Sequence, residues 1–257
     1  MATSLPYGEG GRGRARLKTY VVLNDIQIPF QDKQVLNLVL DFVDDLRPHG
    51  VVLNGDVVDC YELSEFDKNP LQDAGLDREI RESAWLMDRL AHSTKERWWL
   101  GGNHEDRLRR ALWKSPKFGK VRALQFPSLF NLKQYGFKWK PYGGVLALGK
   151  LLVTHGSMVN KHSGWTARSH FEKYGNSVLV GHTHRLGVYY RTNARGVHAS
   201  YENGCLCKLT PEYVQYPDWQ QGFSVVHVDE GGFFSVQLIP ILKRKSFFYG
   251  SQRVSAA

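Results

Sequence analysis

The stretch VVLNGDVVD (residues 51–59) joins a run of apolar, mostly β-branched residues to a polar end. The run predicts a buried strand, and Gly55, Asp56 and Asp59 fall in the loop that follows it. Four further stretches repeat this pattern: TYVVLNDIQ (19–27), RWWLGGNHE (97–105), LLVTHG (151–156) and VLVGHTH (178–184). In open α/β sheets, sites form at the carboxyl ends of strands, so we expect the five polar ends to meet.

Amphipathic helices are predicted between these strands. Asp32 is a candidate N-cap for a helix that Pro48 ends, and further helices are expected over about 78–95, from Glu105 to Trp113, and over about 163–174. The segments after residue 185 are strand-like. This alternation predicts one α/β domain over residues 17–242, between a flexible basic tail (1–16) and a basic C-terminal tail without clear periodicity (243–257).

The composition of the 257 residues is that of a globular protein, with 42% hydrophobic and 23% charged residues. No run of about 18 apolar residues is present, which argues against a membrane span. Three cysteines provide no disulfide framework, which favours a cytoplasmic location. Cys205 and Cys207 form a lone C-x-C, which we interpret as strand packing.

The five polar ends together offer carboxylates, imidazoles and a side-chain amide. This mixture suits Mn²⁺, Fe or Zn²⁺ better than the all-oxygen coordination of Ca²⁺. Five such blocks in this order resemble the calcineurin-like metallophosphoesterases, over about residues 19–200. The resemblance implies a two-sheet β-sandwich flanked by helices, with a dinuclear metal site at the strand ends.

The resemblance also implies a role for each matching residue. Asp56 matches the carboxylate that bridges two divalent metal ions. We expect these ions to be Mn²⁺, with Fe, Zn²⁺, Ni²⁺ and Mg²⁺ as alternatives. Asp25 and His184 match ligands of the first ion, and Asn103, His155 and His182 match ligands of the second. A hydroxide that bridges the ions would attack phosphorus in line.

His104 matches the family's catalytic histidine, which binds the phosphate or protonates the leaving oxygen, and Asp59 matches the carboxylate that orients it. One position departs from the pattern, because Gln27 stands where the family usually has histidine. A neutral amide oxygen is a weaker ligand than imidazole, so the first ion should be held more loosely.

The positive charge of the chain is concentrated in one segment. The formal net charge is +9, yet between Arg107 and Phe171 there is no Asp or Glu. Within this segment, an insert over about 113–147 interleaves basic residues with aromatic ones, as in surfaces that bind nucleic-acid strands. The residues expected to contact substrate are Arg107, Arg110, Lys133, Lys138 and Lys140. A small phosphorylated ligand, or a solvated face over core aromatics, would also account for this composition.

Three functions remain open on the sequence. A phosphodiesterase acting on nucleic acid or nucleotides agrees with the basic segment, although such enzymes more often have Asn-His-Asp where this chain has Asn103-His104-Glu105. A phosphomonoesterase, including protein Ser/Thr phosphatases, usually continues the second block with Arg-Gly, and here that place is Cys60-Tyr61. A non-catalytic scaffold of the same fold is disfavoured by the nearly complete ligand set. The sequence does not predict an oligomeric state.

Overall fold

The central sheet of the molecule is built around β1 (Lys18–Leu23) and β2 (Gly50–Asn54). The computed structural model describes residues 17–212, 215–243 and 245–256. The sheet has the order β11-β10-β1-β2-β3-β4, completed by β3 (Glu96–Leu100), β4 (Phe137–Lys140), β10 (Gly222–Val228) and β11 (Phe234–Pro240). Strands β1 to β4 run parallel, whereas β10 pairs antiparallel with β1 and with β11.

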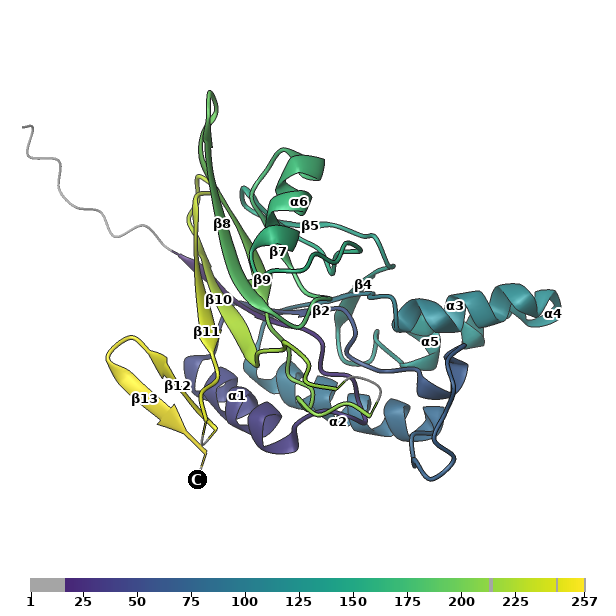
Figure 1. The fold of residues 1–257 in the computed structure, drawn as a ribbon. Helices are drawn as coiled ribbons and strands as arrows, with labels where there is room; N and C mark the ends of the chain where they lie inside the picture. Colours follow the sequence, from purple (N-terminus) through teal and green to yellow (C-terminus); the bar gives the residue numbers. More distant parts are fainter. Residues whose placement is uncertain (1–16, 213–214, 244, 257) are drawn as a thin grey trace, which may run out of the picture.

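A second sheet packs against one face of the first (Figure 1). Its order is β5-β6-β7-β9-β8, from the strands β5 (Leu146–Leu148), β6 (Leu151–Val153), β7 (Val178–Val180), β8 (Leu186–Asn193) and β9 (Gly196–Asn203). Alternate residues of β1 explain the layering. Tyr20 and Val22 face the second sheet, and Val21 and Leu23 face the helices.

The helical layer lies on the other face of the central sheet. It contains α1 (Lys33–Leu46) and α2 (Leu76–Ser93), which lie side by side below the sheet in Figure 1. Toward one side follow the 3₁₀ turns Tyr61–Leu63 and Arg122–Leu124 and the helices α3 (Glu105–Lys114), α4 (Pro116–Gly119) and α5 (Phe126–Leu129). Helix α6 (Trp165–Tyr174) contacts the second sheet. The predicted α/β architecture, two sheets with helices outside, is confirmed.

The C-terminal segment differs from the expected tail. Strands β12 (Ser246–Tyr249) and β13 (Gln252–Ser255) form an antiparallel hairpin. Phe247 is buried there against Phe42 and Phe223, with ring centroids 5.2 and 5.1 Å apart. The hairpin is short and basic, and Phe247 is an aromatic residue that fixes it to the core. The alternation of apolar and polar residues is therefore too weak to predict its strands from the sequence. The expected tail over residues 1–16 lies outside the described residues.

The basic insert is also more ordered than its composition suggested. Its strand β4 joins the central sheet, and Phe126, Phe130 and Phe137 are buried around Trp99. These rings are therefore core residues and not a stacking surface. Within the described ranges, no helix has both the length and the apolarity needed to cross a membrane.

Candidate metal centre

Five loops place polar side chains together at the carboxyl ends of parallel strands. They follow β1, β2, β3, β6 and β7, as the alternating pattern predicted. Several of these side chains sit on backbone that non-glycine residues rarely adopt. At five of the candidate site residues φ lies between 48° and 70°: Asp25, Gln27, Asp56, His182 and His184. Left-handed backbone of this kind is strained and clusters at functional sites.

Asp56 lies at the centre of one group of ligands. His155 Nε2 is 3.2 Å from Asp56 Oδ2 and 3.3 Å from Asn103 Oδ1. Ligand atoms of Asp56, His155 and His182 all lie within 4.8 Å of one another. His155 Nδ1 donates to the Asn54 carbonyl at 2.8 Å, so Nε2 is left to face the carboxylate. The ligand set expected for the second ion is thus brought together.

Asp25 and His184 form the other group. His184 Nε2 is 3.1 Å from Asp25 Oδ1 and 3.3 Å from the Gln27 amide. The two groups are adjacent, because the backbone N–H of His182 donates to Asp25 Oδ2 at 3.0 Å. Gln27 therefore does face the position expected for the first ion.

Three observations show that these residues fit divalent cations. The donor set of carboxylates, imidazoles and amides is typical of Mn²⁺, Fe and Zn²⁺. Asp25 and Asp56 are almost completely buried, and buried carboxylates need a charged partner. Among the described residues, Asp25 Oδ1 has no hydrogen-bond partner, although it faces the His184 imidazole.

His104 sits beside Asp56 and is held by Asp59. Its Nδ1 lies 3.1 Å from Asp59 Oδ2, and its Nε2 lies 3.6 Å from Asp56 Oδ2. Arg107 donates to Asp59 Oδ1 and to the Asp59 carbonyl at 2.8 and 2.7 Å, and its other terminal nitrogen is 3.3 Å from His104 Nε2. The expected His104–Asp59 pairing is present, with Arg107 bracing it.

The charges of these groups are strongly coupled. Burial alone would raise the pKa of Asp56, but the positive charges of His104 and His155 hold it well below its ordinary value. Burial opposes protonation of His155, yet Asp56 raises the pKa of its imidazole to about 9. Burial, followed by repulsion from His155, lowers the pKa of His182 to about 4. Before any cation binds, the site thus balances its carboxylates with its own histidines.

Glu105 is a site residue whose function the sequence analysis missed. Its buried carboxylate accepts from the backbone N–H groups of Asp56, Val57 and Gly102 at 2.9, 2.8 and 2.7 Å. It also accepts from the Trp99 indole at 3.3 Å. Glu105 thereby joins the loops after β2 and β3. The signal was present, because an acidic residue closing a Gly-Asn-His block at the start of a helix can accept from adjoining loop amides.

Close backbone approach explains the glycines of these loops. A Cβ on Gly102 would lie 2.1 Å from Asp56 Oδ1, and one on Gly55 would lie 2.4 Å from His155 Nδ1. Gly55 also has φ of +85°, which disfavours any L side chain. Larger residues at either position would displace a candidate ligand.

Tyr142 and Asn24 complete the surroundings of the two groups. Burial, and then the charge of Asp56, raises the pKa of the half-buried Tyr142 phenol. Asn24 donates to Asp25 Oδ2 and, at 2.7 Å, to the Gly204 carbonyl. Neither residue had a sequence signal beyond its position beside a strand end.

The basic residues expected at the substrate are only partly brought to this site. Lys140 ends β4, where its carbonyl accepts from Gly101, and both Lys138 and Lys140 lie over the Trp98 ring at 4.9 and 5.8 Å. Arg110 is turned toward Asp106 at 2.9 Å. Lys133 lies before β4, at the amino end of the parallel strands, which is the end opposite the ligand loops. The structure therefore does not bring Lys133 to the site.

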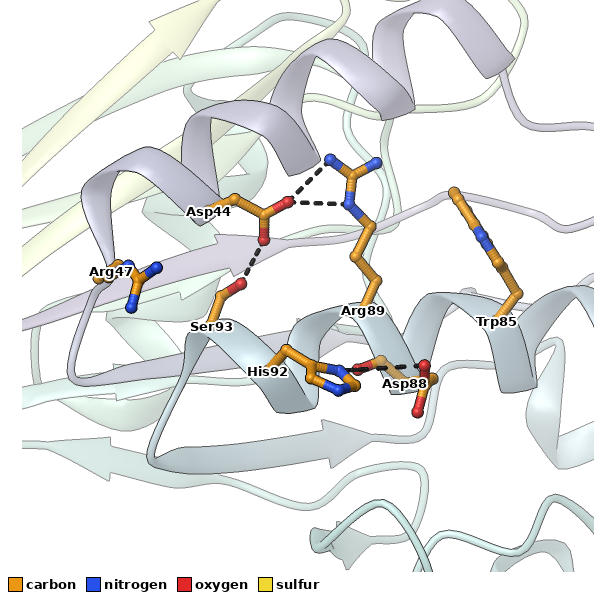
Figure 2. Close-up of a pocket in the computed structure, with 7 residues that line it drawn as sticks. All are labelled: Asp44, Arg47, Trp85, Asp88, Arg89, His92 and Ser93. Atoms are coloured by element: carbon orange, nitrogen blue, oxygen red, sulfur yellow. Dashed lines mark hydrogen bonds and ion pairs between the residues drawn. The ribbon is translucent and has the colours of Figure 1, made fainter.

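A hollow between α1 and α2 is remote from these loops (Figure 2). It is lined by residues near the helix ends that lead into β2 and β3, at the amino ends of the strands. Arg89 there pairs with Asp44 at 2.8 Å and also contacts Asp41. These partly exposed ion pairs account for the feature without a ligand.

Comparisons with known proteins agree with this arrangement. The family model described as calcineurin-like phosphoesterase matches residues 18–186. The Gene 54 protein of Mycobacterium phage D29 is 30% identical over 244 residues, which cover 88% of this chain and 94% of the phage protein. The Gene 54 protein of Mycobacterium phage L5 is 29% identical over 246 residues, with the same coverage.

Among solved structures, Vps29 of Chaetomium thermophilum matches with a TM-score of 0.53 and 9% identity, over 93% of this chain and 99% of that one. At this identity the likeness concerns the fold alone. The ligand-bearing strand ends all lie within or next to the segment that the family model matches. The chain belongs to the calcineurin-like phosphoesterase family.

Proposed function

We propose that this chain is a phosphodiesterase that acts on nucleic acid or nucleotides and depends on two divalent cations, with Mn²⁺ the most effective. The observation that carries the proposal is the convergence on Asp56. Ligand atoms of His155 and His182 lie within 4.8 Å of its carboxylate. His104, in the loop after β3, places its Nε2 3.6 Å from Asp56 Oδ2. Asp25 and His184 stand directly beside this group.

Cation binding is assigned to the two groups described above. Asp25, Gln27 and His184 would hold the first ion, Asn103, His155 and His182 the second, and Asp56 both. Two ions at these positions supply an activated water and neutralise charge on the phosphoryl oxygens. A bound cation also displaces protons from the histidines, so it replaces their positive charge beside Asp56.

His104 is the residue proposed to protonate the leaving oxygen. Burial opposes its protonation, but Asp56 and then Asp59 raise the pKa of its imidazole above the ordinary value. Asp59 holds Nδ1, which leaves Nε2 to face the substrate. Arg107 fixes Asp59 in turn and presents its guanidinium next to Nε2, where a non-bridging phosphoryl oxygen would also contact it.

A diester is favoured over a monoester by the charges around His104. A phosphate monoester carries one more negative charge than a diester, and the nearest guanidinium, that of Arg107, already pairs with Asp59. Cys60, in the place of the family's phosphate-holding arginine, is buried, and its N–H donates to Glu79. The basic edge formed by Lys138 and Lys140 favours a polyanionic substrate.

The test compares three substrates in the presence of Mn²⁺. Bis-p-nitrophenyl phosphate and single-stranded DNA should be hydrolysed, and p-nitrophenyl phosphate much more slowly. Asp56→Asn should abolish both activities and lower the bound Mn²⁺, whereas Asp88→Asn, on the exposed surface of α2, should change neither. Faster hydrolysis of the monoester would favour a phosphomonoesterase. Metal binding without hydrolysis of any of the three would favour a scaffold.

A further inference from the structure

The Cys205-Leu206-Cys207 segment lies directly behind His184. The backbone of Cys205 forms an isolated β-bridge with that of Gln221, and the backbone of Cys207 forms one with that of Gln31. The Cys207 N–H donates to the Asp25 carbonyl at 3.0 Å, so this backbone is fixed to the loop after β1. Residues two apart on extended chain share a face, which places both sulfurs toward His184 while Leu206 enters the core.

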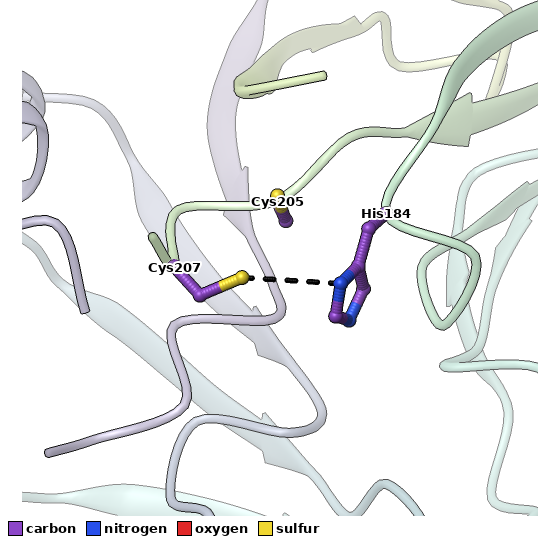
Figure 3. A group of neighbouring side chains, drawn as sticks. All are labelled: His184, Cys205 and Cys207. Carbon is purple, nitrogen blue, oxygen red and sulfur yellow. Dashed lines mark hydrogen bonds between the residues drawn. The ribbon is translucent and has the colours of Figure 1, made fainter. Parts of the chain in front are cut away.

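The two sulfurs and the imidazole are close enough to share one cation. Ligand atoms of His184, Cys205 and Cys207 lie within 4.8 Å of one another, and all three residues are buried. The Cys207 sulfur points at the imidazole and is 3.8 Å from its Nδ1 (Figure 3). Tetrahedral zinc, with Zn–S of about 2.3 Å and Zn–N of about 2.0–2.1 Å, places such atoms about 3.6 Å apart. Little movement is therefore needed.

We propose that Cys205, Cys207 and Nδ1 of His184 form a third metal site, which takes soft divalent ions such as Zn²⁺ and Cd²⁺. Two thiolates and one imidazole are a donor set for such ions and not for Mg²⁺ or Mn²⁺. The site is distinct from the two-cation centre, because it uses the opposite side of the imidazole ring. Its existence does not depend on the proposed hydrolysis.

A soft ion bound at this third site should weaken binding of the first cation, which we assign to Asp25, Gln27 and His184. A neutral imidazole has one lone pair, so a ring bound at Nδ1 carries its hydrogen on Nε2. Binding releases two protons to solvent, one from the Cys205 thiol and one from the Cys207–His184 pair. The hydrogen that the ring keeps on Nε2 then donates to Asp25 Oδ1, 3.1 Å away. The first cation loses His184 as a ligand. A soft ion would thus act as an inhibitor that works through the ring it shares with the first position.

Cobalt provides a direct spectroscopic test. Metal-free protein is titrated with Co²⁺, and the near-ultraviolet absorption of thiolate-to-cobalt charge transfer is followed. The wild type should develop this band as Co²⁺ is added, with an intensity that saturates at one thiolate-bound ion per chain, and Cys205→Ser and Cys207→Ser should each lose it. Asp56→Asn and Cys60→Ser should keep it, because neither residue is among the three ligands. A wild type without the band overturns the proposal, whether or not the variants fold.

A second measurement needs only the wild type. Alkylation of each cysteine is followed by mass spectrometry in moderate urea, with and without Zn²⁺. Zn²⁺ should slow alkylation of Cys205 and Cys207 several-fold more than that of Cys60. Equal protection of all three would reflect general stabilisation and would overturn the site.

Inhibition tests the coupling separately. Zn²⁺ or Cd²⁺ should inhibit Mn²⁺-dependent hydrolysis by the wild type, and Cys207→Ser should need a several-fold higher concentration. If hydrolysis is absent altogether, the proposed function fails while the cobalt band still decides the site. If the cysteine variants weaken Mn²⁺ binding and no thiolate band forms in the wild type, the cysteines only pack against His184 and the proposal is wrong.

Discussion

Asp56 receives contacts from three separate loops of the chain. Its Oδ1 accepts from the His104 backbone at 2.9 Å, its Oδ2 faces His155, and its carbonyl accepts from Gln27. One residue, through its carboxylate and its backbone carbonyl, therefore holds together loops that are far apart in the sequence. Some residues around Asp56 contribute to the chemistry and others hold the loops in position. Three measurements distinguish these roles in variants: the dependence of the rate on the leaving group, the free energy of unfolding, and the amount of bound metal.

His104→Ala should slow hydrolysis in a manner that depends on the leaving group. Loss of a general acid costs about 10²–10⁴ in rate. The loss should be large for DNA, whose leaving alkoxide needs a proton, and much smaller for bis-p-nitrophenyl phosphate, whose nitrophenolate leaves readily. Rates are compared at saturating Mn²⁺, with Asp59→Asn expected to follow the same pattern more weakly. An equal loss on both substrates would assign His104 to phosphate binding.

Glu105→Gln should destabilise the fold while Glu172→Gln, on the exposed face of α6, should not. The glutamine side chain would place an NH₂ group where Glu105 now accepts hydrogen bonds from backbone N–H groups, so donor would face donor. A buried group left unpaired costs about 1–3 kcal/mol, so the free energy of unfolding should fall by at least this amount. Urea unfolding measures it. An unchanged midpoint would show that the loops after β2 and β3 do not depend on this carboxylate.

Whole elements were predicted well where their sequence signal is local. Strands β1 and β2, helix α1 with its Asp32 cap, and the ligand-bearing strand ends follow from apolar runs and caps. The hairpin β12–β13 and strand β4 were not predicted, because they are stabilised by contacts distant in sequence, such as that of Phe247 with Phe42. For the same reason, C-x-C gave no hint of His184, because the two segments are brought together by the pairing of β7 with β9, strands that are not consecutive in the sequence.

Asp32 links two of these elements, and its substitution should be sensitive to pH. Its carboxylate caps α1 by accepting from Val35 at 3.2 Å, and it also accepts from Gln221 and Lys245. Burial would raise the pKa of Asp32, but Lys245 and the other donors lower it below the ordinary value of about 3.9. Its contribution to stability is therefore present above that value and is lost as the pH falls through the lowered pKa.

Asp32→Ala should cost about 1 kcal/mol for the cap, plus a further loss from the Lys245 pair, at pH 7. The difference from wild type should shrink below pH 4. Asp32→Asn keeps a capping oxygen and loses the ion pair, so its free energy of unfolding should lie between those of the wild type and Asp32→Ala. Urea unfolding at several pH values measures each difference. A difference that is constant down to pH 3 would mean that the charge of Asp32 does not contribute.

At the scale of the whole molecule, the position of the basic residues matters more than their number. The parallel strands direct their carboxyl ends to the ligand loops, so residues at the two ends of β4 differ in their distance from the site. Lys140 adjoins the Gly101–Asn103 loop, whereas Lys133 lies at the other end of the sheet. Both are lysines of one short segment. Replacing Lys133 therefore removes the same charge from the segment as replacing Lys140, but away from the site, and serves as the control.

A strand of nucleic acid held at the site should therefore distinguish these lysines. Lys138→Ala with Lys140→Ala should weaken binding of single-stranded DNA to an Asp56→Asn background, which prevents cleavage during the measurement. Each phosphate contact contributes about 0.7 to the slope of log affinity against log salt for single strands, so the double variant should flatten this slope by about 1.4. Lys133→Ala should leave the slope unchanged, since this residue lies before β4, at the amino end of the strand. Hydrolysis of bis-p-nitrophenyl phosphate by the double variant in the otherwise wild-type chain should be nearly normal, because the ligands and His104 remain. An equal flattening by Lys133→Ala would show that the field of the whole basic segment, and not the edge beside the metal centre, attracts the polyanion.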